Sequence, residues 1–263
     1  MGMPVLDPQP SEKPLAEAVR LQSDGLGLAA CVFRPADAES PAPAIICCHG
    51  FASCKENHAP FARQAAEHGF LVLTFDFRGH GASEGCLDSN SVNDIGAALA
   101  YLQADEQVDP ARIAVRGSSM GGLFALCAGA QWPDLAAVVA ICPAPAGVLA
   151  KLLREVADPQ TAWGAARLSD PDFPRVMGCD LSCWLEKADV GTVVGQISPR
   201  PLLLIHCAGD EVVPAVTSAD LYAQAHDPKT RWLVPGGDHR FAQHDPTTTE
   251  RTLAWLDAEA GNT

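Results

Sequence analysis

A serine flanked by glycines is the strongest candidate nucleophile in the chain. Ser119 is the centre of Gly117-Ser118-Ser119-Met120-Gly121, which follows a short apolar run at residues 112–115. Glycines two positions before and after a serine permit a sharp turn from strand to helix, where larger side chains would collide. The serine then lies at a helix N-terminus, whose amide groups favour developing negative charge. The spacing predicts a nucleophile elbow for acyl transfer.

The same G-x-S-x-G spacing occurs a second time, at Gly81-Ala82-Ser83-Glu84-Gly85. Ser83 stands several residues beyond the apolar run at 70–75, and a polar segment follows it instead of a helical one. Only Ser119 has strand, turn and helix in the order that an elbow requires. We therefore expect Ser83 to be a loop residue.

A serine hydroxyl needs a base to take its proton and an acid to orient that base. On a parallel α/β sheet with such an elbow, the acid follows the serine in the chain and the histidine comes last. Asp210 meets this order, because a short loop separates it from the apolar run at 201–207. Glu211 is the adjacent alternative. Asp76 precedes the serine, so we expect it instead to bond amides of the loop at residues 78–80.

Among the later histidines, His239 is the predicted base, because it follows the run at 231–234 through the loop Pro235-Gly236-Gly237-Asp238. A histidine on a flexible loop just past the last strand can reach the elbow. His244 is the second candidate, although its position suggests the approach to the final helix. His206 falls inside an apolar run, which favours a core role.

The negative charge that forms during acyl transfer needs two amide donors. One is expected from Met120, the residue after the nucleophile. The other is expected from Phe51, in the loop His49-Gly50-Phe51 that follows the apolar run at 44–48. The ring of Phe51 could also line the acyl pocket. His49 is interpreted as a brace for this loop and not as a second base.

These residues must be positioned by the elements around them, and apolar runs alternate with segments of helical periodicity throughout the chain. Runs that are apolar on both faces are typical of buried parallel strands. The sequence therefore predicts a doubly wound, mostly parallel α/β sheet. The expected strands are 18–23, 27–33, 44–48, 70–75, 112–115, 136–141, 201–207 and 231–234, and the expected helices are 61–68, 94–102, 123–130, 215–225 and 248–258.

One long segment interrupts this alternation. Residues 144–198 are expected to contain no strand, and we interpret them as a helical cap, with a helix at 149–156. Trp163, Phe173 and Trp184 give this segment aromatic bulk, and Phe51, Trp163 and Trp184 are predicted to bind substrate. Residues 1–17 are predicted to be an N-terminal arm, and residues 18–143 and 199–263 the core.

Composition excludes several functions. The net charge of −14 repels nucleic acid, and no stretch reaches the roughly 20 apolar residues that a membrane helix needs. The N-terminus lacks the features of a secretory signal, so a cytoplasmic location and reduced cysteines are expected. Cys179 and Cys183 have no matching Cys or His pair for a zinc site. We expect no metal and no organic cofactor.

Taken together, the motifs resemble the α/β-hydrolase superfamily. The resemblance is carried by His49-Gly50-Phe51, Asp76-Phe77-Arg78-Gly79-His80-Gly81, Gly117-Ser118-Ser119-Met120-Gly121-Gly122, Gly209-Asp210 and Gly237-Asp238-His239. More narrowly, the chain is similar to bacterial serine esterases related to feruloyl esterases, dienelactone hydrolases and serine-aminopeptidase-like proteins. The resemblance implies oxyanion amides from Phe51 and Met120 and a cap that shapes the acyl site. Dienelactone hydrolases proper use cysteine where this chain has Ser119.

The expected function is therefore a serine carboxylesterase that acts on small to medium carboxylic esters through an acyl-enzyme. A thioesterase, an amidase or aminopeptidase, or an acyltransferase would use the same three side chains. A hydrolase-like receptor with little turnover is the alternative from another class. The expected partner is a small-molecule ester, and the chain is expected to be a monomer or a homodimer.

Overall fold

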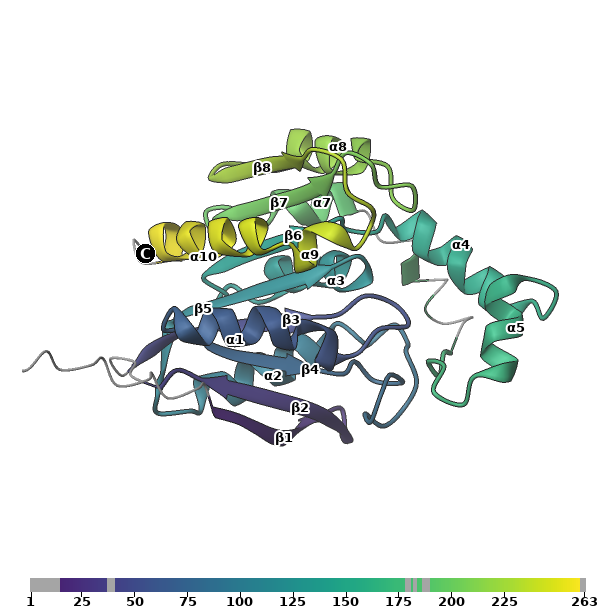
Figure 1. Cartoon of the computed structure of the whole chain (residues 1–263), viewed down its shortest axis with the longest axis horizontal. Helices are drawn as coiled ribbons and strands as arrows, with labels where there is room; N and C mark the ends of the chain where they lie inside the picture. Colours follow the sequence, from purple (N-terminus) through teal and green to yellow (C-terminus); the bar gives the residue numbers. More distant parts are fainter. Residues whose placement is uncertain (1–14, 37–40, 178–180, 182–183, 186–189, 261–263) are drawn as a thin grey trace, which may run out of the picture.

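The apolar runs become strands of one eight-stranded sheet with the order β1-β2-β4-β3-β5-β6-β7-β8 (Figure 1). The computed structural model describes residues 15–36, 41–177, 181, 184–185 and 190–260. β1 pairs antiparallel with β2, and β2 with β4, whereas all the other neighbours are parallel. The strands are β1 (Leu15–Ser23), β2 (Leu26–Arg34), β3 (Ala42–Cys48), β4 (Leu71–Phe75), β5 (Val108–Ser118), β6 (Ala137–Ile141), β7 (Leu202–Cys207) and β8 (Lys229–Val234).

Helices cover both faces of this sheet, which confirms the predicted doubly wound α/β architecture. The face that includes Ile46 and Val115 is covered by α2 (Asn93–Gln103), α3 (Met120–Gln131), α7 (Val190–Gly195) and α8 (Val216–Gln224). The opposite face is covered by α1 (Ala59–Glu67), α9 (Phe241–His244) and α10 (Pro246–Ala260). A short 3₁₀ helix, η1 (Lys55–His58), precedes α1.

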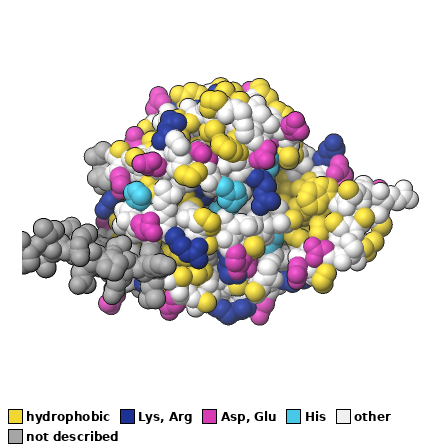
Figure 2. All heavy atoms as spheres, in the orientation of Figure 1, with side chains coloured by type: hydrophobic (Ala, Val, Ile, Leu, Met, Phe, Trp, Pro, Cys, Tyr) yellow, Lys and Arg dark blue, Asp and Glu magenta, His cyan; other side chains and the backbone are white. Residues whose placement is uncertain are grey.

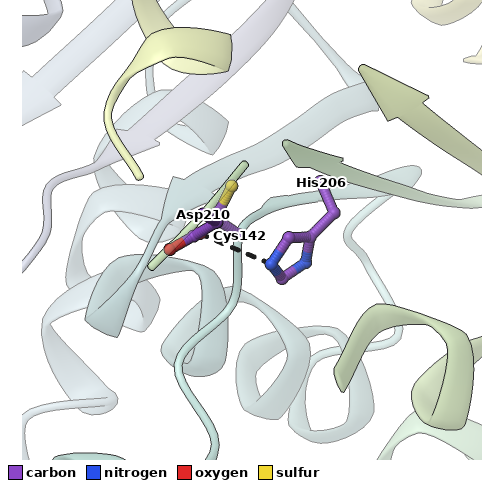
Figure 3. Close-up of side chains that lie close together, drawn as sticks. All are labelled: Cys142, His206 and Asp210. Carbon is purple, nitrogen blue, oxygen red and sulfur yellow. Dashed lines mark ion pairs between the residues drawn. The ribbon is translucent and has the colours of Figure 1, made fainter. Parts of the chain in front are cut away.

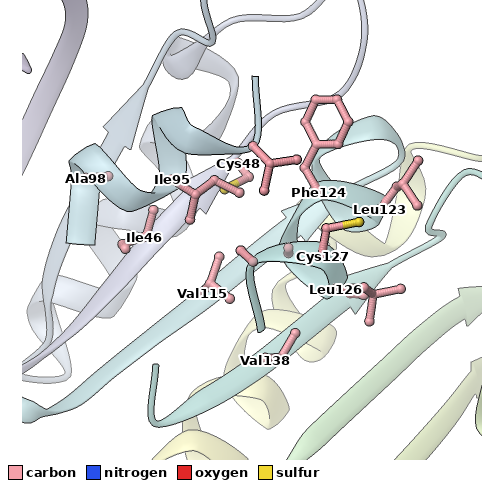
Figure 4. Packing of buried hydrophobic residues seen from close by; sticks show 14 of the residues in the cluster. Ile46, Cys48, Ile95, Ala98, Val115, Leu123, Phe124, Leu126, Cys127 and Val138 are labelled. Carbon is pink, nitrogen blue, oxygen red and sulfur yellow. The ribbon is translucent and has the colours of Figure 1, made fainter. Parts of the chain in front are cut away.

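The core beside Ser119 joins α3 to the middle of the sheet (Figure 4). Ile46 on β3, Val115 on β5 and Val138 on β6 are fully buried, as are Ile95 on α2 and Phe124 on α3. Burying one side chain of this size stabilises a fold by about 1.5–3 kcal/mol. The N-terminus of α3, where Ser119 lies, is therefore fixed against the central strands.

β5 begins earlier than its apolar run predicts. Its register against β3 shifts between Ala42, which pairs with Val108, and Ala44, which pairs with Ile113. This irregularity leaves residues 109–112 outside the regular pairing, and two of the four are exposed. Such a bulge needs no alternating or continuous apolar pattern, so hydrophobicity alone does not reveal it.

The segment at residues 144–198 contributes α4 (Ala146–Ala157) and α5 (Ala162–Ser169), which extend away from the sheet (Figure 1). Val176 forms an isolated parallel bridge with Leu87, which ties this segment back to the body. α7 also falls within the predicted cap, but it packs against α3 and α8. The boundaries of the cap remain a prediction.

The predicted N-terminal arm overlaps the first strand, because residues 15–17 belong to β1; residues 1–14 lie outside the described part of the chain. The eight cysteines that the structure describes are free, and Cys179 and Cys183 are not among them. Within the described residues, none of the helices combines the length and the apolar character that a membrane crossing requires.

Candidate active site

The backbone at Ser119 has the conformation of a sharp elbow. Ser119 lies between β5 and α3 with φ 55° and ψ −118°, a region that residues with a side chain seldom adopt. Its N–H donates to the carbonyl of Ile141 at 2.9 Å, and its own carbonyl accepts the amide of Ala144 at 3.0 Å. The turn is therefore held from β6 and from the residues that lead into α4.

Glycines at the elbow are required by close backbone contacts. A Cβ on Gly117 would lie 2.0 Å from the carbonyl oxygen of Gly121, so the two glycines of the motif face each other. A Cβ on Gly121 would lie 2.3 Å from the carbonyl oxygen of Cys48. These contacts press the first turn of α3 against the loop after β3, which brings that loop to Ser119.

Three side chains from distant parts of the chain form one hydrogen-bonded series. Nε2 of His239 lies 2.9 Å from Oγ of Ser119, and its Nδ1 lies 2.7 Å from Oδ2 of Asp210. His239 follows β8 and is partly exposed, whereas the Asp210 carboxylate is fully buried. Asp210 only accepts when ionised, so Nδ1 carries the hydrogen and Nε2 is free to accept the serine proton.

Asp210 is held by its own loop. Its Oδ1 accepts the amides of Val212 at 2.9 Å and Val213 at 2.8 Å. Burial alone would raise the pKa of Asp210, but hydrogen bonds from His206, His239 and the Val213 amide outweigh burial and hold that pKa well below its usual range. Asp210 is thus kept ionised. Glu211, the alternative acid, is exposed.

His206 is a contributor to this site that the sequence analysis did not identify (Figure 3). Its Nε2 lies 2.9 Å from the carbonyl oxygen of Val213 and 3.4 Å from Oδ2 of Asp210. Because a carbonyl oxygen only accepts, Nε2 carries the hydrogen and donates it to Val213, and this N–H group also lies beside the carboxylate of Asp210. The signal in the sequence was a histidine four residues before the acid, at the end of the same strand.

Cys142 joins His206 and Asp210 in a buried group whose possible ligand atoms lie within 4.8 Å of one another. Metal ligands must be deprotonated. Here burial raises the pKa of the Cys142 thiol, and the nearby Asp210 carboxylate raises it further. Nε2 of His206 carries a hydrogen, and both oxygens of Asp210 already accept hydrogen bonds. We therefore interpret the group as support for Asp210 and not as a metal site.

The loop after β3 passes next to Ser119. A Cβ on Gly50 would lie 3.3 Å from Cβ of Ser119. Nε2 of His49 accepts the amide of Phe77 at 3.0 Å, so its Nδ1 carries the hydrogen that is donated to the Gly50 carbonyl at 2.7 Å. His49 thus braces the loop. The oxyanion role of the Phe51 amide, and of the Met120 amide at the start of α3, remains a prediction.

The remaining candidates take structural positions. Ser83 is buried in a loop, where its hydroxyl donates to the Asp76 carbonyl at 2.6 Å and accepts the amide of Ala29 at 2.9 Å. Asp76 accepts the backbone amide and the ammonium group of Lys55 and the amide of Ala82, a different set of partners from those expected at residues 78–80. His244 lies in α9 and contacts Gln243.

Aromatic rings gather beside the loop after β3. The ring centroid of Phe51 lies 5.8 Å from that of Trp163 on α5 and 6.0 Å from that of Phe173. Two of the three predicted substrate-binding residues therefore meet, and Phe173, which was not among them, joins the group. Trp184 is not in this group, because it packs against Phe124 of α3, with 6.2 Å between ring centroids.

Comparison with known proteins adds sequence evidence to this geometry. The family model described as alpha/beta hydrolase fold matches residues 43–177. The uncharacterized protein Rv2307c of Mycobacterium tuberculosis is 31% identical over 221 residues, which are 82% of this chain and 69% of that protein. The uncharacterized protein YfhR of Salmonella typhi is 29% identical over 212 residues, which are 76% of this chain. The chain spans 65% of the length of YfhR.

A solved structure shares the same arrangement of strands and helices. The structure of Est1E from Butyrivibrio proteoclasticus, with ferulic acid bound, superimposes with a TM-score of 0.77. The likeness covers 93% of this chain and 100% of Est1E, at 23% sequence identity. At 23% identity, this likeness supports the fold alone.

Proposed function

The chain belongs to the α/β-hydrolase fold family, and from this premise we propose that it is a serine carboxylesterase with Ser119, His239 and Asp210 as its catalytic residues. The observation that carries the proposal is the pair of contacts made by His239, 2.9 Å to Oγ of Ser119 and 2.7 Å to Oδ2 of Asp210. Both distances are those of direct hydrogen bonds, so a proton can pass from Ser119 to His239 without rearrangement.

In the first half of the reaction, Oγ of Ser119 attacks the ester carbonyl carbon while Nε2 of His239 takes the hydroxyl proton. Asp210 stabilises the cationic imidazole that results. The amides of Phe51 and Met120 hold the negative oxygen of the tetrahedral intermediate. The intermediate then collapses, the C–O bond to the alcohol breaks, and His239 returns the proton to the departing oxygen.

In the second half, water attacks the acyl-enzyme. His239 takes a proton from the water and returns it to Oγ of Ser119 as the carboxylic acid leaves. His239 carries out every proton transfer in both halves of this reaction. The binding of ferulic acid by Est1E, a protein of similar fold, is consistent with a carboxylic acid as the product.

The decisive experiment compares the two serines of the repeated motif. Ser119→Ala should abolish the burst of nitrophenol from nitrophenyl acetate and lower kcat on the order of 10⁶-fold. Ser83→Ala is the matched control, and it should keep the burst because the hydroxyl of Ser83 bonds the backbone of Ala29 and Asp76. A fluorophosphonate should label wild type at Ser119, as mapped by peptide mass spectrometry. Turnover like wild type in Ser119→Ala would refute the proposal.

A further inference from the structure

A cavity of about 960 Å³ lies between α4, α5 and the segment that ends in the bridge at Val176. Its apolar wall includes Leu153 and Val156, which are buried side chains of α4, together with Phe173 and Val176. Hydrophobic side chains also gather on the surface between the sheet body and the part that carries α4 and α5 (Figure 2). The cavity therefore suits the apolar part of a ligand.

Phe173 links this cavity to the nucleophile. It lines the cavity, and its ring lies 6.0 Å from that of Phe51 between centroids. Phe51 follows Gly50, where a Cβ would lie 3.3 Å from Cβ of Ser119. The rings of Phe51 and Phe173 thus lie between the surroundings of Ser119 and the cavity, and we take them as the wall along which an acyl chain runs from the ester.

Helix α4 gives the length that such a chain needs. Its first residue, Ala146, comes two residues after Ala144, whose amide donates to the carbonyl of Ser119. Leu153 and Val156 lie seven and ten residues farther along, which is about 10–15 Å of helix. A group that spans this distance is longer than an acetyl or butyryl group.

The cavity also carries basic side chains from three successive elements. Arg154 comes from α4, Arg167 from α5, and Arg175 from the segment beyond them, whereas Asp170 is an acidic residue in the same lining. Arg175 is oriented by the main chain, because it donates to the carbonyls of Ser83 and Gly85. A protein with a net charge of −14 disfavours anions in general. The local excess of arginine makes this cavity an exception that favours an anionic group.

We propose that the cavity binds the acyl group of the substrate and that this group ends in a carboxylate, so that the substrate is a long monoester of a dicarboxylic acid. The inference rests on the proposed esterase function. Guanidinium groups bind carboxylates through short, charge-assisted hydrogen bonds. The apolar wall holds the methylene chain, and Arg167 and Arg175 hold its far end.

Binding is measured by calorimetry on Ser119→Ala, which holds an ester without consuming it. Monomethyl sebacate has the proposed length and charge, methyl 10-hydroxydecanoate has the length without the charge, and monomethyl adipate has the charge without the length. Monomethyl sebacate, called sebacate below, should bind about tenfold tighter than either of the other two esters. A tenfold difference in Kd is the effect expected of one good charge-assisted contact. Equal affinity for sebacate and the hydroxy ester would overturn the proposal.

Two arginine variants test where the charge acts. Arg167→Gln, made in the Ser119→Ala protein, should remove most of the preference for sebacate over the hydroxy ester. Arg63→Gln is the matched control, since Arg63 is exposed on α1 and packs over Phe33, outside the cavity lining. An equal loss of preference in both variants would attribute the effect to overall charge and overturn the assignment of the cavity.

Turnover of nitrophenyl acetate by the wild-type chain distinguishes a failure of the acyl-group inference from a failure of the esterase function. If the acetate ester is cleaved but sebacate shows no advantage in binding, the acyl-group inference fails and the esterase function stands. If the acetate ester is not cleaved and Ser119 is not labelled, the esterase function fails, and the inference that rests on it fails as well.

Discussion

At the scale of single residues, the orientation of the His239 ring depends on one carboxylate. Asp210 accepts the Nδ1–H of His239 with Oδ2 and the amides of Val212 and Val213 with Oδ1. Its loop thus fixes the carboxylate, and the carboxylate fixes the tautomer of the histidine. In the proposed mechanism, His239 is therefore oriented as the base before any substrate arrives, which lowers the reorganisation needed during the reaction.

Asp210→Asn should leave the contacts to the loop in place but change the tautomer of His239. The amide can donate to Nδ1, which would put the hydrogen on Nε2, where it cannot accept the proton of Ser119. We expect kcat on nitrophenyl acetate to fall roughly 10⁴-fold, as for the equivalent change in other serine triads. Stopped-flow kinetics measures this loss, and Glu211→Gln, at the exposed neighbour, is the control.

His206 should act as a positioning residue for Asp210. His206→Phe removes the Nε2–H that lies 2.9 Å from the Val213 carbonyl and 3.4 Å from Asp210. We expect kcat to fall about tenfold with little change in KM, because His206 is fully buried. His206→Gln restores an N–H donor and should recover part of the rate. A rise in KM with unchanged kcat would contradict this role.

Site residues could be predicted where their position relative to a strand places them, and could not be predicted where tertiary packing places them. Ser119, Asp210 and His239 each come just after an apolar run, so the sequence places them at one edge of a parallel sheet. The positions of His206 and Phe173 relative to the apolar runs do not predict their roles. The role of His206 depends on how the chain bends back after β7, and that of Phe173 on how α5 and the segment after it fold over the loop at Phe51.

At the scale of elements, the elbow depends on the close approach of α3 to the loop after β3. Gly121→Ala would place a Cβ 2.3 Å from the backbone carbonyl oxygen of Cys48, and backbone cannot move as a flexible side chain can. We expect a loss of about 1–3 kcal/mol in the free energy of unfolding, measured by urea denaturation. Activity per folded molecule should also fall, because the loop with the Phe51 amide is displaced.

Gly147→Ala is the control for this change. Gly147 lies in α4, and no heavy atom lies within 4 Å of the position that its Cβ would take. Alanine favours helix over glycine by up to about 1 kcal/mol, so stability should stay the same or rise slightly. Equal destabilisation by the two substitutions would show that the contact with Cys48 is not what requires glycine at position 121.

The ends of elements were less predictable than their existence. β5 was expected from its apolar residues alone, yet it starts at Val108, because an irregular pairing with β3 accommodates polar residues. In the predicted cap, the helix at 149–156 was found with longer bounds, as α4. The packing of α7 against α3 was not predicted, because the residues of α7 do not indicate which helix they contact.

At the scale of the whole molecule, the loops that follow five neighbouring parallel strands all reach the candidate site. Gly50 follows β3, Ser119 follows β5, Cys142 follows β6, Asp210 follows β7 and His239 follows β8. Parallel strands bring all of these loops to the same edge of the sheet. Loss of the sheet therefore removes the whole site at once, and activity should disappear together with global unfolding.

Stability of the whole molecule should depend on pH through buried histidines. Burial lowers the pKa of His49, of His58 and of His80 below the value of about 6.5 that histidine has in an unfolded chain. The unfolded state then binds more protons, so stability is full above about pH 6.5 and is lost as the pH falls. Each histidine contributes a slope of up to about 1.4 kcal/mol per pH unit.

Urea denaturation between pH 8 and pH 5 measures this slope, in a range where Asp210 stays ionised. His58→Gln should make the curve flatter, whereas His68→Gln, at an exposed position, should leave its shape unchanged. A free energy of unfolding that stays constant from pH 7 to pH 5 would show that these rings gain their protons without unfolding.

The part of the chain with α4 and α5 is anchored to the sheet body near both of its ends. On one side, the amide of Ala144 donates to the carbonyl of Ser119; on the other, the amide of Arg175 donates to the carbonyl of Gly79, and Leu87 pairs with Val176. A segment that is attached to the body near its two ends can be exchanged as one unit. Exchange of the span between these anchors with that of a relative should therefore transplant substrate preference while the chemical steps stay with the host.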